Sequence, residues 1–225
     1  EGGRTVLTRR YPYEDVASKT GRPVEELKAL VEKCRPDLYN IRSARVSPSR
    51  DEKIITSWNA LAISAFAQGY RLFGDDKYMD AAVKTAHYLK ANHWHLTNLS
   101  RSSTGGTQSG NGILDDYAFL TNAMLDLFSA TGDENHLAWA LELAGIIQQR
   151  FRHESAGFYH TPVAFEAPLG RQVELIDSVE PSGLSMALRV FLRLGAIEGN
   201  VDYLNMVRDD LEAYAEIIKK AGMEM

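Results

Sequence analysis

Apolar residues recur at helical spacing along most of the chain after residue 50. The first such stretch has Ile63 and Ala67 on one face, which predicts an amphipathic helix over about 56–73. A Gly-Asp break separates it from a second stretch with the same period, over about 76–92. Because Gly suits the end of a helix and Asp suits the start of the next one, the pattern predicts two antiparallel helices joined by a short turn.

This layout occurs three times. The predicted hairpins span about 51–94, 113–151 and 180–222, and in each a polar lead-in runs into an apolar helix. Repeated units of two helices are typical of stacked helical hairpins, in which each hairpin buries its apolar face against its neighbours. Residues 1–50 differ from the repeats, and we interpret them as an N-terminal helical segment and linker that precedes the three α/α hairpins of residues 51–225.

The connections between the hairpins are much longer than the breaks within them. They cover residues 93–111 and 152–179, and loops of this length are uncommon in compact domains unless they are functional. If the hairpins stack in parallel, both connections gather at the end where the first helix of each hairpin begins. We call this end the rim and expect the functional site there. Residues 157–175 indicate an irregular β-hairpin, whereas residues 102–112 are expected to be mobile.

Composition and charge narrow the classes of function. A hydrophobic fraction of 44% and a charged fraction of 24% are typical of an ordinary globular protein. A net charge of −5 and the lack of a basic run argue against nucleic acid or an anionic membrane as a partner. Without a long apolar run or a signal core, a cytoplasmic location is expected. The single cysteine, Cys34, excludes a disulfide within this chain.

Three motifs carry a family resemblance. They read DEKIITSWN at 51–59, LDDYAF at 114–119 and PSG at 181–183. Together they resemble the C-terminal part of the thioredoxin-domain proteins related to spermatogenesis-associated protein. The resemblance implies an N-terminal thioredoxin-like domain in the longer protein, followed by an (α/α)6 toroid similar to six-hairpin glycosidases and N-acylglucosamine 2-epimerases. Ala60 and Leu184 depart from the family pattern, which has Gly and Asn at these positions.

The fold class that we expect is therefore all-α. Three α/α-hairpin repeats would make half of an (α/α)6 toroid, which is six-hairpin glycosidase-like, with a small irregular β-hairpin in a rim loop. Half a toroid leaves apolar faces open. We therefore interpret the chain as a fragment that pairs with the missing N-terminal part of the full-length protein, or with a second copy as a homo-oligomer.

The candidate catalytic residues are acids at helix starts. Asp115 and Asp116 are adjacent, and both could simply cap a helix, or one could face the site. We expect Asp116 to cap and Asp115 to face the site. Asp177 supplies a third carboxylate one hairpin later, either as an exposed loop acid or as a catalytic partner. A carboxylate pair from two hairpins would suit glycoside hydrolysis.

Candidate substrate-binding residues lie near the same helix starts. Aromatic faces can stack on sugar rings, and polar side chains can bind sugar hydroxyls; the residues are Trp58, Asn59, Tyr117, Glu180, Ser182 and His160. Trp58 would suit a core anchor equally well. An epimerase would instead need an acid–base His or Glu near a sugar carbon, and His160 is available on a long rim loop. We expect no metal site and no cofactor.

These residues and the resemblance favour a carbohydrate-processing or sugar-binding domain, glycosidase-like or epimerase-like, with a carbohydrate or a sugar phosphate as its partner. The alternative is a non-catalytic scaffold that binds the thioredoxin-like domain or a client protein. Convergence of Asp115 or Asp116 with Asp177, Trp58 and Tyr117 in one pocket would favour a sugar site. Dispersal of these residues would favour the scaffold.

Overall fold

The computed structural model describes residues 8–164, 168 and 170–221. The chain divides into two compact units, residues 1–51 and residues 52–225. No helix within the described ranges is both long enough and apolar enough to cross a membrane.

The first unit consists of two helices, α1 (Tyr13–Thr20) and α2 (Val24–Ser43). Pro36 lies inside α2, where a proline removes one helical hydrogen bond, and the helix continues past it. In the described part of this unit, Leu27 is the buried apolar side chain. So small an apolar core predicts low stability for this unit by itself.

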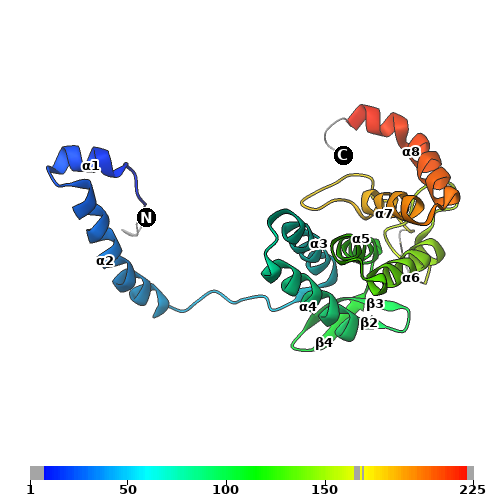
Figure 1. Cartoon of the computed structure of the whole chain (residues 1–225), viewed down its shortest axis with the longest axis horizontal. Coiled ribbons are helices and arrows are strands. Elements are labelled where there is room, and N and C mark those ends of the chain that lie inside the picture. Colours follow the sequence, from blue (N-terminus) through cyan, green and yellow to red (C-terminus); the bar gives the residue numbers. More distant parts are fainter. Residues whose placement is uncertain (1–7, 165–167, 169, 222–225) are drawn as a thin grey trace. The chain divides into compact units, whose positions relative to one another are not determined.

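The second unit, which we call the helical unit, contains three helix pairs (Figure 1). They are α3 (Thr56–Phe73) with α4 (Asp76–Asn92), α5 (Leu114–Thr131) with α6 (Glu134–Phe151), and α7 (Gly183–Glu198) with α8 (Val201–Ala221). In Figure 1, α5 lies in the middle, with α3 and α7 on either side of it. The predicted all-α class with three α/α hairpins is confirmed.

Glycine followed by aspartate forms the turn inside the first two hairpins. Gly74 ends α3 with φ +67° and Gly132 ends α5 with φ +70°, a left-handed conformation that glycine adopts at little cost. The side chains of Asp75 and Asp133 then accept a hydrogen bond from the backbone N–H two residues on, at 3.1 and 2.9 Å. The two turns predicted from the sequence are therefore present.

Helix α5 is the centre of the core. Every residue from Leu114 to Leu127 is buried, because α3, α6 and α7 all pack against this one helix. Aromatic side chains such as Phe119, Phe151 and Phe191 are fully buried around it. Burying one such side chain contributes about 1.5–3 kcal/mol. Because three neighbours share α5, the hairpins form one core rather than three.

A small antiparallel sheet lies beside the helices. The strands are β1 (Ile54–Ile55), β2 (Trp94–His95), β3 (Asn98–Thr104) and β4 (Thr107–Asn111), and β3 pairs with each of the other three. The predicted β-hairpin is therefore present at a different place. It forms over residues 98–111, most of which were expected to be mobile. The described part of 157–175 contains no strand, apart from a single bridge between Phe158 and Arg152.

The polar segment 98–111 forms strands because β3 can pair with the free edge of β1. Ile54 and Ile55 pair with Ser103 and Ser102, so β3 is held against the start of α3. Leu99 is buried on the same strand. This pairing joins segments far apart in the sequence, and a local reading of the few apolar residues could not anticipate it.

His93 connects the sheet to α3. It is fully buried, with Nδ1 2.7 Å from Thr56 Oγ1 and Nε2 2.9 Å from Ser103 Oγ. The Thr56 hydroxyl donates its one proton to the carbonyl of Ser100. The proton on the ring must therefore sit on Nδ1 and point to Thr56, while Nε2 accepts from Ser103. Burial lowers the pKa of His93, so the ring is neutral.

We expect the free energy of unfolding to fall as the pH drops below the ordinary histidine value of about 6.5. Because the pKa of His93 is lower in the folded chain, the unfolded chain binds the proton more readily. The stability present above that pH is then lost as the pH falls toward the folded-state pKa. Urea unfolding at pH 7.5 and pH 5 should show a larger loss for the parent than for His93→Gln. An equal loss in both proteins would contradict this.

Candidate functional site

The first turns of α3, α5 and α7 meet at the rim. Ser57 of α3 donates its backbone N–H to a carboxylate oxygen of Asp116 at 3.0 Å. Gly183, the first residue of α7, lies so close to Asp115 that a Cβ there would overlap its carboxylate. The two aspartates at the start of α5 thus each touch the start of a neighbouring helix. Helix N-termini carry partial positive charge, which favours carboxylates at this position.

Asp116 is fully buried and joins these elements. Its Oδ1 accepts from Ser57, and its Oδ2 accepts from the backbone N–H of Ile113 at 3.0 Å and from Arg101 Nη1 at 3.2 Å. The bond to Ile113 caps α5, as expected for this residue. Burial raises the pKa of Asp116 to about 6, against the three donors that lower it. Because both oxygens are occupied, we assign Asp116 to positioning.

Asp115 differs sharply from its neighbour. It is 7% exposed, yet its Oδ1 has no hydrogen-bond partner. His160 Nδ1 lies 3.8 Å from this oxygen and 3.3 Å from Glu174 Oε2. The carbonyl of His160 accepts from the N–H of Leu114 at 2.9 Å, which holds the histidine at the start of α5. Burial raises the pKa of Asp115; Glu174 and Glu180 raise it further, while His160 lowers it.

A buried ion pair fixes the loop that carries His160. Asp210 of α8 is 1% exposed and accepts from Arg152 Nη2 and from the backbone N–H of Gly157, both at 2.9 Å. The adjoining Phe158 is fully buried. The imidazole therefore stands on an anchored segment, and an anchored group can be held in a productive orientation.

Unpartnered polar atoms concentrate at this rim. Among the described residues, six buried side-chain N or O atoms have no hydrogen-bond partner, and five are Ser57 Oγ, Asp115 Oδ1, His160 Nδ1, Thr161 Oγ1 and Glu180 Oε2. The sixth, Trp139 Nε1, belongs to α6. Since buried polar groups are nearly always bonded, such a cluster marks a place where a ligand can supply the missing partners.

The predicted aromatic and amide residues are placed differently from one another. Trp58 is 60% exposed at the start of α3, so it is not a core anchor. Asn59 donates to the carbonyl of Ile55 at 2.8 Å. Tyr117 is 3% exposed, and its hydroxyl accepts from the N–H of Leu99 at 2.9 Å. The ring of Tyr117 is thus almost fully enclosed.

Asp177 and Ser182 are engaged at the start of α7. Asp177 Oδ1 accepts from the N–H of Ser182 at 2.8 Å and from the Ser185 hydroxyl at 3.3 Å. Ser182 Oγ accepts from the N–H of Ser185 at 3.2 Å, as an N-cap residue does.

Tyr117 lines a separate cleft of about 320 Å³. In the described hollows, Asp115, Asp177, Trp58 and Tyr117 do not line one pocket together; this dispersal is the outcome that favours the scaffold over the sugar site.

Three residues at the rim were not selected from the sequence. Arg101 lies on β3, immediately before the segment 102–112 that was expected to be mobile, and Glu174 lies in a long connection with no motif. Gly183 carried a signal, since the PSG motif places the smallest residue at a helix start. Asp115, His160 and Glu174 each present one ligand atom, all within 4.8 Å of one another. In the described part of the chain, these are the residues that could hold a divalent cation, although none was expected.

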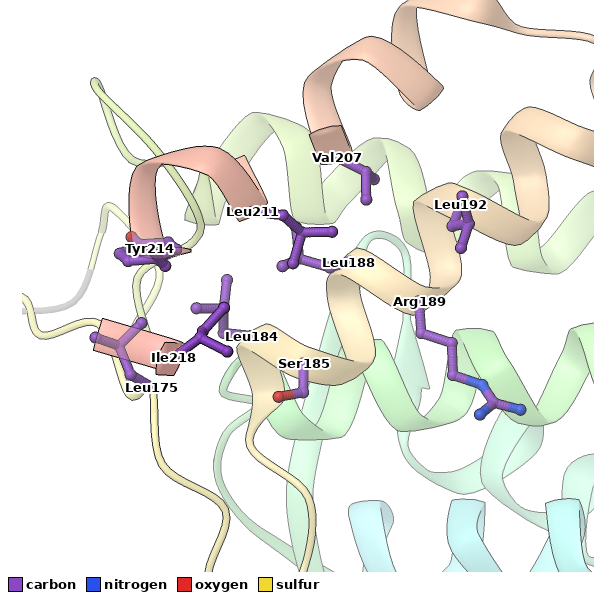
Figure 2. A pocket seen from close by; sticks show the side chains of 10 residues that line it. All are labelled: Leu175, Leu184, Ser185, Leu188, Arg189, Leu192, Val207, Leu211, Tyr214 and Ile218. Carbon is purple, nitrogen blue, oxygen red and sulfur yellow. The ribbon is translucent and has the colours of Figure 1, made fainter. Parts of the chain in front are cut away.

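The two departures from the family pattern both have apolar surroundings. Ala60 is fully buried in the core. Leu184 faces an apolar groove of about 270 Å³ between α7 and α8, beside Leu188, Leu211 and Tyr214 (Figure 2). Both substitutions therefore affect packing rather than the polar cluster.

Comparison with known proteins gives a homologue. No family model matches the chain. The chain is 30% identical over 238 residues to human spermatogenesis-associated protein 20, covering 99% of this chain and 30% of that protein. The chain is homologous to part of that protein. An uncharacterized protein of Caenorhabditis elegans is 32% identical over 208 residues, which is 89% of this chain and 28% of the relative. The chain thus spans less than a third of the length of these relatives.

Solved structures of sugar enzymes share the fold. The cellobiose 2-epimerase of Spirochaeta thermophila matches with a TM-score of 0.60 and 17% identity, over 75% of this chain and 44% of that one. A family 76 glycoside hydrolase from a bovine Bacteroides thetaiotaomicron strain matches with a TM-score of 0.60 and 16% identity, over 72% and 35%. At such identities the likeness shows the fold alone. The chain forms about half of an α/α toroid, as predicted.

We expect Asp116→Asn to lower the free energy of unfolding by about 2–4 kcal/mol. An amide has one acceptor oxygen where the carboxylate has two, and its NH2 would face a donor. Asp177→Asn is a suitable control, because the Asp177 carboxylate is partly exposed. This substitution should lower the free energy of unfolding by at most about 1 kcal/mol. Urea denaturation at pH 7 measures both. An equal loss of stability in both variants would mean that Asp116 does not hold the starts of α3 and α5 together.

Proposed function

We propose that the rim is a sugar-processing site at which Asp115 exchanges a proton with the substrate. The observation that carries this proposal is that two unpartnered buried atoms, Asp115 Oδ1 and His160 Nδ1, face each other 3.8 Å apart. Sugar hydroxyls both donate and accept hydrogen bonds, so one substrate can satisfy carboxylate, imidazole and hydroxyl groups together. The shared fold of a cellobiose 2-epimerase and a D-mannose isomerase supports sugar as the substrate class.

The gap between Asp115 and His160 fits one hydroxyl group. Their facing atoms are 3.8 Å apart, too far for a direct hydrogen bond. An oxygen about 2.8 Å from each atom would sit between them at ordinary hydrogen-bond distance. The hydroxyl would donate to Asp115 Oδ1 and accept from Nδ1–H of His160, and this fixes its orientation.

The surroundings of Asp115 suit proton transfer. Burial and the nearby carboxylates of Glu174 and Glu180 raise its pKa, which brings an acid closer to the pH at which it works. His160 lies between Asp115 and Glu174, with Nδ1 3.8 and 3.3 Å from their oxygens. Its Nδ1–H can therefore donate toward the substrate hydroxyl while it faces both the buried carboxylate and the exposed one.

An exposed aromatic residue, Trp58, lies at the same end of the helical unit as Asp115. Its indole is 60% exposed at the start of α3, next to the residue that bonds to Asp116. Exposed aromatic rings at binding sites provide a flat apolar face with little loss of entropy. We assign Trp58 to stacking on a sugar ring. Asp116, behind it, keeps the start of α3 in place.

We expect Asp115→Asn to reduce sugar turnover by about 10²–10⁴-fold, the range for loss of general acid–base catalysis. Stability should stay equal or rise, because an unpartnered buried carboxylate is replaced by a neutral group of the same shape. Asp177→Asn should keep its activity. The assay follows cellobiose, mannose and α-mannosides by NMR in D2O, with a metal chelator present throughout.

This assay separates reaction types. Deuterium incorporation beside the sugar carbonyl would indicate an epimerase or isomerase, and new reducing ends would indicate a glycosidase. If no sugar is turned over, and none shifts the melting temperature of the parent more than that of Asp115→Asn, the proposal fails. The non-catalytic scaffold would then be the better account of this chain.

A further inference from the structure

Another hollow, distinct from the Tyr117 cleft and the α7–α8 groove, lies on the helical unit away from the rim. It has a volume of about 680 Å³, within the range of small-molecule sites, and every lining residue belongs to α3, α5 or α7. Arg71 lines it from the last turn of α3, while Arg189 and Arg193 line it from α7. Asp126 of α5 supplies the one carboxylate of the lining.

That carboxylate neutralises only one of the three guanidinium groups. Asp126 Oδ1 pairs with Arg193 Nη1 at 2.8 Å, and the same nitrogen donates to Asn122 Oδ1 at 2.7 Å. Within the described residues, Arg71 and Arg189 have no carboxylate within ion-pair distance. The Nε and Nη2 groups of Arg193 likewise have no acceptor there. The hollow thus carries three positive charges against one negative charge.

This excess charge is accessible to a negatively charged ligand, because Arg71 and Arg189 are both exposed. Arg189 and Arg193 are four residues apart on α7, and like charges at that spacing repel each other on a helix. The chain as a whole carries a net charge of −5, yet Asp126 is the one acidic residue in the lining of this hollow. Figure 2 shows the Arg189 side chain extending away from the apolar side chains of the α7–α8 groove. Its guanidinium is therefore free for the hollow lined by α3, α5 and α7.

We propose that this hollow binds a phosphorylated small molecule. The net charge of the lining matches a phosphate dianion, and the planar guanidinium fork binds phosphate through two parallel hydrogen bonds. The volume of about 680 Å³ leaves room for an organic body beside the phosphate. Neutral molecules gain no charge–charge attraction from this lining, and cationic molecules are repelled by its net positive charge.

The phosphate site is separate from the proposed sugar site. Asp115 and Asp126 both lie on α5, eleven residues apart, which is about 16 Å along a helix. A hexose phosphate is shorter than this and cannot occupy both places. The inference therefore stands or falls independently of the chemistry at the rim.

The test is calorimetric titration of the full chain with inorganic phosphate and with glucose 6-phosphate at low ionic strength. We expect both to bind, glucose alone not to bind at this hollow, and added salt to weaken the binding. Arg71→Gln and Arg189→Gln should each reduce phosphate affinity by about tenfold or more, because each removes a charge-assisted contact.

Two control variants locate the binding. Arg208→Gln removes an arginine that pairs with Asp209 at 3.1 Å elsewhere on the unit, and it should bind phosphate as the parent does. Asp115→Asn alters the rim and should also leave phosphate binding unchanged. The proposal is overturned if phosphate does not bind, if Arg71→Gln and Arg189→Gln bind it as tightly as the parent, or if Arg208→Gln weakens it equally.

Discussion

The rim depends on one buried carboxylate. Asp116 receives hydrogen bonds from the first turn of α3, from the residue before α5 and from Arg101 on β3. Without Asp116, the buried N–H of Ser57 would be a donor without an acceptor, which is costly. The next residue, Asp115, is oriented by the same helix turn. Asp116 thus helps to set the position of Asp115, although Asp116 is not itself one of the unpartnered residues.

Helix starts and catalytic sites attract the same kinds of residue. The first N–H groups of a helix need acceptors, so aspartate and serine are favoured there whether or not a reaction takes place. Backbone N–H groups donate to Asp177 Oδ1, to Ser182 Oγ and to both oxygens of Asp116. Asp115 Oδ1 receives no such hydrogen bond. What separates a capping acid from a candidate catalytic acid is therefore whether its lone pairs are already used, and sequence alone cannot show that.

The parts of the fold that could be predicted are those set by local rules. Helical periodicity and the Gly-Asp turns depend on residues close in sequence, and both were predicted correctly. The β3–β4 hairpin was missed because β3 is held by β1, which lies far back in the chain. The contact of His160 with Asp115 depends on a loop fastened to Asp210 near the end of the chain. Tyr117 was expected at a surface, but α5 is enclosed by three helices and buries it.

The two ends of the helical unit differ in how freely they can change. The turns after α3 and α5 are two residues of fixed conformation, so an insertion there would disturb both helices that they join. The rim connections are long, and doubling the length of a long loop costs only about 0.6 kcal/mol of closure entropy. New side chains can therefore be introduced over the rim while the helices below keep their packing. A scaffold of this kind can acquire a different substrate preference by lengthening a loop, without first having to be restabilised.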